Sequence, residues 1–283
     1  MGIRNFTTAS EADYAKGVCT PAFRSEKWRM MGDKTPSQTD RYYSFKQGNV
    51  VRFLALDTQP MVVETWQDTP SYPKGKPSPD QKGRQQTYVK DQQTFFVDTV
   101  LQPMETLWHI AFGHHPYISN GPHGNAGNYD NLSCPTSLKT EDKERKDNPR
   151  LSPGWQCGLQ MRDFMESLCA QELDLYLSGH DHSLQWLSKD CGSRKVEFIV
   201  SGAGAGGDKL TTVKDKNQDP AVDVRFTPAG KTPGFVYLVV NDTQIDVQLV
   251  DASTPETPRC IKRGTLTKTA RGAPVRFAEN TCM

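Results

Sequence analysis

The stretch LDLYLSGHDH, residues 173–182, sets a short apolar run directly before two histidines. An apolar run of this length that ends at glycine is typical of a buried strand. A second stretch, LWHIAFGHH at residues 107–115, repeats the arrangement. Apolar residues between the two predict a helix over 158–171, so this region is predicted to be a strand–helix–strand unit. Such a unit implies two parallel strands joined by a right-handed crossover, with ligands bound beyond their carboxyl ends.

The remaining pattern extends this unit to an α/β fold with a β-rich second half. A hairpin is predicted around the turn at 47–49, and a helix with one buried face over 86–102. Further strands are predicted at 183–187, 196–200, 235–240 and 245–250. Three polar or proline-rich stretches, 58–85, 116–156 and 203–232, are predicted to be loops, and long loops are often functional.

Composition excludes several classes of protein. The 283 residues carry 34 Lys and Arg against 33 Asp and Glu, a net charge of +1, which argues against a nucleic-acid partner. Basic residues gather in the last 29 positions with Phe277 as the one aromatic residue among them, the pattern of a solvated end. The longest apolar runs are far below the ~20 residues that span a bilayer, and no signal peptide is visible.

Seven cysteines leave two interpretations open. They are either scattered buried thiols or disulfides of an exported protein, with pairs such as Cys134–Cys157 and Cys260–Cys282 and one cysteine left over. The second interpretation favours an extracytoplasmic location, periplasmic or secreted, for a full-length form.

All six histidines fall between residues 109 and 182. Five of them follow the two predicted parallel strands, where a preceding glycine allows a sharp turn of the backbone. In His180-Asp181-His182 the spacing of two directs both rings to one side of an extended segment. Neutral imidazole is the commonest protein ligand for metals, so the sequence predicts a metal site at this sheet edge. The alternative is that no metal binds, with one histidine pair in a surface turn and the other covering the core.

These histidine stretches resemble the last two motifs of the calcineurin-like metallophosphoesterases, most closely in the purple acid phosphatase branch. The likeness extends over about residues 40 to 268 and includes FLALDT at 53–58, SGAG at 201–204 and a closing hairpin at 234–252. The resemblance implies a mixed-sheet αββα sandwich. It also implies domain bounds: a polar lead segment at 1–40, the phosphoesterase domain at 41–268 and a basic tail at 269–283.

Roles follow from the resemblance residue by residue. His114 and His180 would bind one metal of a pair, and His182 would bind the other. His123 lies where the family has a histidine that contacts the substrate phosphate and aids the leaving group. The two ions would be divalent or trivalent, and imidazole ligands suit Fe, Zn or Mn.

Four further residues receive structural roles. His115 is expected to support or pack against the site rather than to bind metal. Asp181 is expected to stabilise the turn, because its side chain points opposite to its neighbours. His109, inside a strand, is expected to be a core histidine with satisfied hydrogen bonds, and Asp57 a structural residue.

The sequence also departs from the family pattern. The Asp-x-Gly, Gly-Asp and Gly-Asn-His motifs that supply the other metal ligands are absent. The resemblance therefore predicts the C-terminal portion of the domain, incomplete at its N-terminus.

Three functions are consistent with these features. The first is hydrolysis of a small phosphate ester by an acid-phosphatase-like phosphomonoesterase with a dinuclear centre. The second is a catalytically inactive fragment that acts at most as a binding module. The third is a mononuclear zinc hydrolase that uses His114, His180 and His182, although no general base for it is identifiable.

Overall fold

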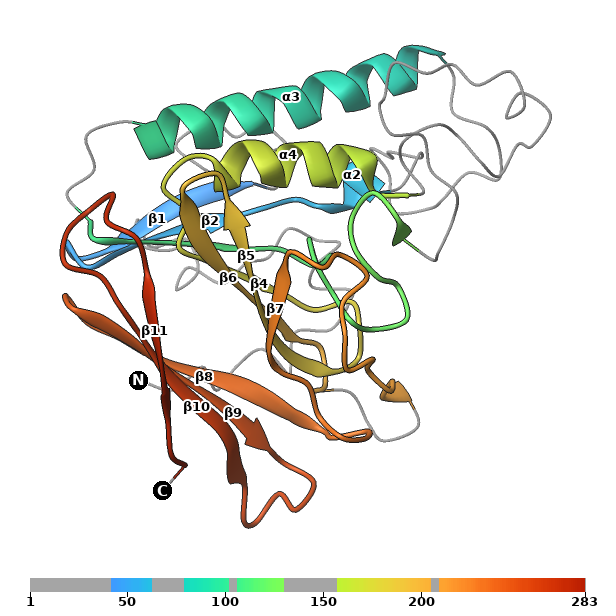
Figure 1. The fold of residues 1–283 in the computed structure, drawn as a ribbon. Helices are drawn as coiled ribbons and strands as arrows, with labels where there is room; N and C mark the ends of the chain where they lie inside the picture. The colour runs from blue at the N-terminus through green and yellow to red at the C-terminus, as the bar shows by residue number, and fades with distance from the viewer. Residues whose placement is uncertain (1–41, 63–78, 102–105, 130–156, 205–208, 283) are drawn as a thin grey trace, which may run out of the picture.

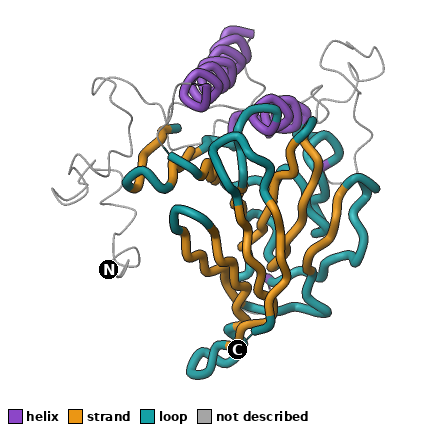
Figure 2. The backbone as a smooth tube through the Cα atoms, turned by 60° about the vertical axis from the view of Figure 1, so that its left-hand side comes forward, coloured by secondary structure: helices purple, strands orange, loops and turns teal. Residues whose placement is uncertain are grey.

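The computed structural model describes residues 42–62, 79–101, 106–129, 157–204 and 209–282. They form three layers: helices, a seven-stranded sheet and a four-stranded sheet (Figure 1). Figure 2 shows the same order from a second direction, with the helices on one side of the strands. No helix in the described part of the chain is long and apolar enough to span a membrane.

The larger sheet has the order β1-β2-β3-β4-β6-β5-β7. Strands β2, β3, β4 and β6 are parallel to one another. At one side β1 pairs antiparallel with β2, and at the other β5 pairs antiparallel with both β6 and β7. The strand bounds are β1 (Tyr43–Gln47), β2 (Val51–Ala55), β3 (Trp108–Phe112), β4 (Leu175–Ser178), β5 (Leu184–Cys191), β6 (Arg194–Ser201) and β7 (Val222–Phe226).

The smaller sheet is antiparallel throughout and has the order β11-β10-β9-β8. Its strands are β8 (Gly234–Val240), β9 (Gln244–Asp251), β10 (Arg259–Thr267) and β11 (Arg276–Asn280).

Three helices cover one face of the larger sheet. They are α2 (Gln59–Val62), α3 (Pro79–Leu101) and α4 (Leu159–Cys169). Helix α4 is amphipathic and buries Met161, Phe164 and Met165 against the sheet. Phe96 of α3 is fully buried and meets Phe164 edge to face, so α3 packs on both α4 and the sheet.

The second core lies between the two sheets. Successive residues of a strand point to opposite faces, so on β6 Phe198 joins the helical core while Ile199 joins the inter-sheet core. Trp186 of β5 is fully buried in this second core. A Cβ at Gly264 of β10 would lie 2.7 Å from the Trp186 ring, so only glycine allows the sheets to approach this closely.

The structure confirms the predicted strand–helix–strand unit: β3 and β4 are parallel neighbours, with α4 between them in the chain. The first hairpin and the 235–250 hairpin are also confirmed. Helices cover only one face of the described sheets, so one helical layer of the expected αββα sandwich is seen among the described residues.

Several loop predictions were wrong. Part of 58–85 is helical, since α2 forms directly after β2 and α3 begins at Pro79, a residue suited to the first turn of a helix. The stretch 203–232 contains β7, which pairs with a longer β5 than predicted. Isolated short segments such as 222–226 carry too little periodicity to reveal a strand that is stabilised by its neighbour.

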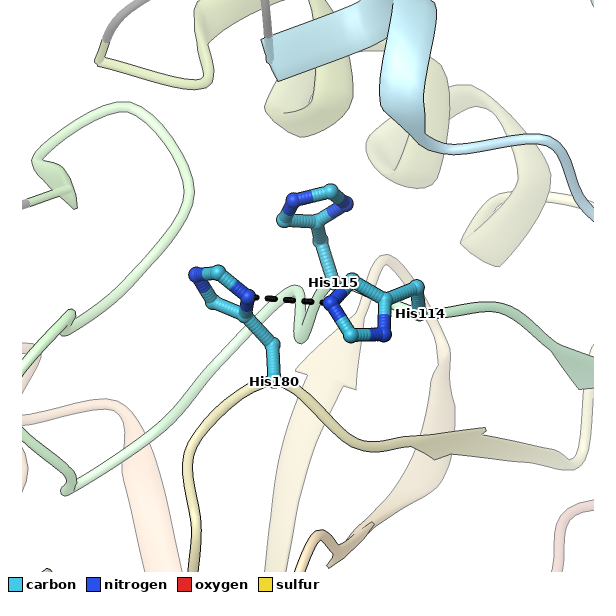
Figure 3. Close-up of side chains that lie close together, drawn as sticks. All are labelled: His114, His115 and His180. Carbon is cyan, nitrogen blue, oxygen red and sulfur yellow. Dashed lines mark hydrogen bonds between the residues drawn. The ribbon is translucent and has the colours of Figure 1, made fainter. Parts of the chain in front are cut away.

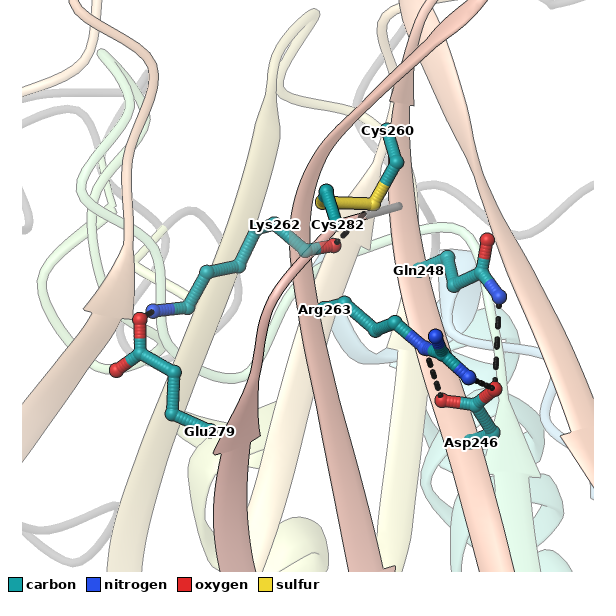
Figure 4. Close-up of a disulfide and its surroundings, with 7 residues drawn as sticks. All are labelled: Asp246, Gln248, Cys260, Lys262, Arg263, Glu279 and Cys282. Carbon is teal, nitrogen blue, oxygen red and sulfur yellow. Dashed lines mark hydrogen bonds and ion pairs between the residues drawn. A yellow bond between two sulfur atoms is a disulfide. The ribbon is translucent and has the colours of Figure 1, made fainter.

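Strands β10 and β11 were also not predicted. Their basic residues form pairs with neighbouring strands instead of a solvated tail (Figure 4). Arg263 binds both carboxylate oxygens of Asp246 on β9, at 3.1 and 2.8 Å, and Lys262 pairs with Glu279 on β11. Charged residues that pair across strands replace the alternation of apolar and polar residues from which a strand is predicted.

The cysteines support the disulfide interpretation. Cys260 of β10 is bonded to Cys282, just beyond β11, as predicted (Figure 4). Cys157 is also disulfide-bonded, and its predicted partner Cys134 lies outside the described residues. Cys169 and Cys191 are free.

A buried ion pair connects the end of the smaller sheet to the larger one. The Lys268 ammonium donates to both carboxylate oxygens of Asp174, each at 2.8 Å, and to the Leu107 carbonyl at 2.8 Å. Both charged side chains are 0% exposed, and Arg194 adds a further contact to Asp174 at 3.2 Å. A buried charge needs such partners, so removal of one partner leaves the other uncompensated.

We therefore expect Lys268→Ala to lower the free energy of unfolding by about 3–5 kcal/mol, the usual cost of breaking a buried pair. Lys262→Ala on the adjacent strand is the matched control, because Glu279 is largely exposed and such pairs contribute about 0–1 kcal/mol. Urea denaturation of both variants measures the difference, and equal losses would contradict a special role for the buried pair.

Candidate metal centre

The carboxyl ends of three parallel strands meet at one edge of the larger sheet. Hydrogen bonds between neighbouring strands continue past the strand ends, from the Gly113 amide to the Leu177 carbonyl at 3.0 Å and from the Gly179 amide to the His114 carbonyl at 3.0 Å. These bonds fix the segment after β3 against the segment after β4. The histidines that follow each strand are therefore adjacent, as predicted.

Three histidines form the one group of potential metal ligands found among the described residues. His114, His115 and His180 each offer a ring nitrogen, and these atoms all lie within 4.8 Å of one another. Figure 3 shows one ring nitrogen of His180 directed at one of His114, with the ring of His115 beside them. His114 Nε2 and His180 Nδ1 are 3.1 Å apart.

The 3.1 Å separation fits two ligands of a single ion. Two nitrogen ligands at about 2.0–2.1 Å from one ion lie roughly 2.9–3.4 Å apart for coordination angles of about 90–109°. The same distance also fits a hydrogen bond between two neutral rings. The donor set itself, imidazoles on a rigid sheet edge, is one that Zn, Fe and Mn accept.

The sharp turn of the backbone occurs at His180 itself. Its φ is 60°, and it is the one non-glycine residue with positive φ in the described part of the chain. The expectation that glycine provides this turn was wrong, because neither Gly113 nor Gly179 is among the glycines with positive φ. Left-handed backbone is uncommon at a non-glycine residue, and residues in such strained conformations cluster at functional sites.

Gly113 is required for a different reason. A Cβ there would lie 2.7 Å from Thr58 Cγ2 and 2.8 Å from the Tyr176 hydroxyl oxygen. Because glycine has no Cβ, Thr58, just after β2, can approach His115. The His115 amide donates to Thr58 Oγ1 at 3.1 Å, and His115 Nδ1 lies 2.9 Å from the same oxygen. The Tyr176 hydroxyl donates to the His115 carbonyl at 2.7 Å.

Burial keeps two of these imidazoles neutral. Burial, with further contributions from the neighbouring His180, His114 and His123, lowers the pKa of His115 to about 3. Burial, followed by the influence of His182, lowers the pKa of His114. A neutral ring retains the unprotonated nitrogen that a metal requires.

His182 lies outside the three-histidine group, and its ring orientation is set by a backbone carbonyl. Its Nδ1 lies 2.8 Å from the Lys209 carbonyl oxygen. Because a carbonyl only accepts, Nδ1 carries a proton, and in the neutral tautomer that this contact selects Nε2 is the nitrogen with the lone pair. Metal-binding histidines are commonly oriented in this way.

His123 approaches the cluster from the loop after β3. Its ring centre lies 4.3 Å from that of His180, so the loop brings it against the group. Asp181 holds this loop: its carboxylate accepts from the Ser119 hydroxyl and, at 3.3 Å, from the His123 amide. A Cβ at Gly121 would lie 2.5 Å from the Asp181 carboxyl carbon, so the loop packs directly on this buried side chain.

Asp181 is thus bonded to the loop that carries His123, the environment expected of a turn-stabilising carboxylate. It is 0% exposed. Sequence reasoning identified Asp181 but missed Ser119 and Thr58. Thr58 could have been found, since it follows the end of a predicted strand next to the histidines, whereas Ser119 has no signal beyond its position in a loop.

Two other sequence predictions concern residues near this edge. His109 is fully buried in β3 and its Nδ1 donates to the Glu172 carbonyl at 2.9 Å, but Nε2 has no hydrogen-bond partner, so its bonds are only half satisfied. Asp57 accepts from the Tyr88 hydroxyl at 3.1 Å, which ties the end of β2 to α3 and fits a structural role.

The loop after β3 closes on itself before the stretch 130–156. The amides of Gly127 and Tyr129 both donate to the Cys157 carbonyl, at 2.7 and 3.3 Å. The described residues that flank this stretch, Tyr129 and Cys157, therefore lie side by side.

Comparison with known proteins gives a partial relationship. No family model matches the chain. Purple acid phosphatase 3 of Arabidopsis thaliana is 26% identical over 155 residues, which are 55% of this chain and 32% of that protein. Tartrate-resistant acid phosphatase type 5 is 29% identical over 86 residues in Rattus norvegicus and 27% over 93 residues in Sus scrofa.

The matched regions cover 30% and 33% of this chain, and 25% and 26% of the rat and pig proteins. The chain thus matches a third or less of the length of these curated relatives.

Two solved structures show a similar arrangement. Purple acid phosphatase PPD1 from yellow lupin (Lupinus luteus) seeds has a TM-score of 0.43 at 12% identity, over 78% of this chain and 32% of that one. PhoD has a TM-score of 0.48 at 15% identity, over 88% of this chain and 45% of that one.

The sequence relationship therefore rests on the curated relatives. Over part of its length, the chain is a distant homologue of the purple acid phosphatases and the tartrate-resistant acid phosphatases.

Proposed function

We propose that this chain takes part in metal-dependent hydrolysis of phosphate esters, as an acid-phosphatase-like phosphomonoesterase with a dinuclear centre. The observation that carries the proposal is the 3.1 Å separation of His114 Nε2 and His180 Nδ1 at the carboxyl edge of parallel strands. The distant homology to acid phosphatases supports the same reaction class. Within this proposal the two sheets are the centre of an αββα sandwich, of which the chain provides the C-terminal portion.

The proposed ligand assignment follows the ring orientations. His114 and His180 bind one ion through the two facing nitrogens. His182 binds the second ion through Nε2, which the Lys209 carbonyl leaves unprotonated. His115 supports the site through Thr58. The ions are Fe, Zn or Mn, since all three accept imidazole.

Each component has a separate chemical task. Bound ions supply positive charge that polarises the phosphoryl group and activates water. The His123 ring lies against the cluster without belonging to the ligand group and can give a proton to the departing alcohol oxygen. Asp181 sets the position of His123 through the backbone of the loop.

A catalytically inactive binding module is the second candidate. It is favoured by one specific feature: the His114–His180 contact is also a satisfactory hydrogen bond in protein without metal. Metal content separates the two candidates.

We expect His114→Ala and His180→Ala to reduce the occupancy of one metal ion and His182→Ala to reduce that of the other. Loss of any of these ligands should nearly abolish turnover, because the reaction depends on the metal pair. Elemental analysis after dialysis, with turnover measured in parallel, tests this.

His123→Ala is the matched control and should keep its full metal content. His115→Asn should also keep both ions. If the unsubstituted protein retains no Fe, Zn or Mn, the metal proposal fails and the binding module remains.

Kinetics test the role of His123. We expect His123→Ala to lower kcat/KM for an alkyl phosphate by roughly 10²–10⁴-fold, the range for loss of a general acid. The loss should be much smaller for 4-nitrophenyl phosphate, because nitrophenolate departs without a proton. Equal losses for both esters would exclude His123 as the acid.

We also propose an extracytoplasmic location for the full-length form. Disulfides persist in oxidising compartments and are rare in the cytosol, and the chain holds one between Cys260 and Cys282.

Thiol titration of denatured, non-reduced protein from its native source provides the test. We expect Cys157, Cys260 and Cys282 to be protected from alkylation, and the same cysteines to react after reduction. Seven reactive thiols before reduction would contradict the proposed location.

A further inference from the structure

The loop that carries His123 is held from a second side by a segment far away in the chain. Asn217, in the connection between β6 and β7, donates from Nδ2 to Asn120 Oδ1 at 2.7 Å and to Asn125 Oδ1 at 3.1 Å. Asn125 Nδ2 donates back to Asn217 Oδ1 at 2.6 Å. The side-chain amides of Asn217 and Asn125 therefore bind each other reciprocally. The two loop residues that Asn217 contacts, Asn120 and Asn125, lie on either side of His123 in the sequence.

Asn125 also closes the loop on itself. Its Oδ1 accepts from the Ser119 amide at 3.0 Å, and the adjacent Ala126 amide donates to the Tyr117 carbonyl at 2.8 Å. His123 thus lies inside a loop whose two ends, Ser119 and Asn125, are joined by one side chain. Asn217 binds that closing side chain, and it also contacts the Ser119 carbonyl at 3.3 Å.

Asn217 is itself held firmly by its surroundings. Its Oδ1 accepts from the Asp219 amide at 2.9 Å, and Asp219 pairs with Lys189 of β5 at 2.9 Å. Two further bonds join the segments: the Lys214 amide donates to the Asn120 carbonyl at 3.0 Å, and Asn120 Nδ2 donates to the Lys214 carbonyl at 3.0 Å. The 214–219 segment is therefore anchored to the sheet and can transmit that position to the loop.

We propose that Asn217 is a second positioning residue for His123, beside Asp181. It acts through Asn120 and Asn125 and fixes the distance between the His123 ring and the histidine cluster. This inference rests on the proposed function, in which His123 serves as the proton donor. A shift of about 1 Å in such a group can cost on the order of 100-fold in rate.

Two substitutions test the proposal. Asn217→Ala removes every bond of the amide, and Asn217→Asp keeps the size but removes both N–H donors, which leaves a carboxylate against the acceptor oxygens of Asn120 and Asn125. Gln218→Ala is the matched control. Gln218 is the next residue in the chain, and its side chain accepts a hydrogen bond from Asn128 on the exposed side of the loop. We expect both Asn217 variants to lower kcat for an alkyl phosphate about 10- to 100-fold with a smaller loss for 4-nitrophenyl phosphate.

A double variant separates positioning from general structure. When His123→Ala is already present, Asn217→Ala should cause no further loss of kcat, because the group that it positions is gone. An equal further loss in that background, or an equal loss for both esters, would overturn the proposal.

Hydrogen exchange gives a measurement that does not depend on activity. Asn217→Ala should accelerate amide exchange across 119–126 and leave β5 and β6 unchanged, whereas Gln218→Ala should leave 119–126 protected. If the unsubstituted protein hydrolyses neither ester, the proposed function fails, and exchange alone decides whether Asn217 positions the loop. Unchanged exchange at 119–126 would overturn the inference.

Discussion

The parallel pairing of β3 with β4 is the constraint on which the site depends. The pairing continues beyond the strands, since the Gly179 amide donates to the His114 carbonyl. This bond sets the relative height of the two segments that carry His114 and His180. No direct attraction between the two rings is needed to bring them together, because the hydrogen-bonded backbone of the sheet fixes the positions of the residues that carry them.

A second level of organisation is polar and buried. Asp181 lies between His180 and His182 in the sequence, but its carboxylate is directed into the protein. There it accepts hydrogen bonds from the Ser119 hydroxyl and the His123 amide. Desolvating a carboxylate is costly unless hydrogen bonds compensate it. Here those bonds connect the segment after β4 to the loop after β3, so one buried charge links two parts of the site.

The sequence predicted the strand–helix–strand unit because its signal is local: short apolar runs that end at glycine and histidine. It also placed His114, His123 and His180 at one sheet edge, and the structure brings their rings together. The left-handed backbone of His180 was not predicted, because a non-glycine residue rarely adopts it and the preceding glycine was the expected place for the turn.

Strands β10 and β11 show a second limit of sequence reasoning. Their charged residues predicted a solvated end, but Arg263 and Lys262 form ion pairs with Asp246 and Glu279 on adjacent strands. A pattern of single residues does not reveal which charges will face each other across a sheet. The role of Asn217 is hidden for the same reason, since its partners lie more than ninety positions away in the chain.

The closure of the loop at Cys157 has a consequence for how such a protein can diversify. Because Gly127 and Tyr129 both bind the Cys157 carbonyl, the described residues before and after 130–156 are held next to each other. The entropic cost of lengthening a chain segment between two fixed ends grows only slowly with its length. Insertions between these two fixed points therefore need not move the histidines on either side.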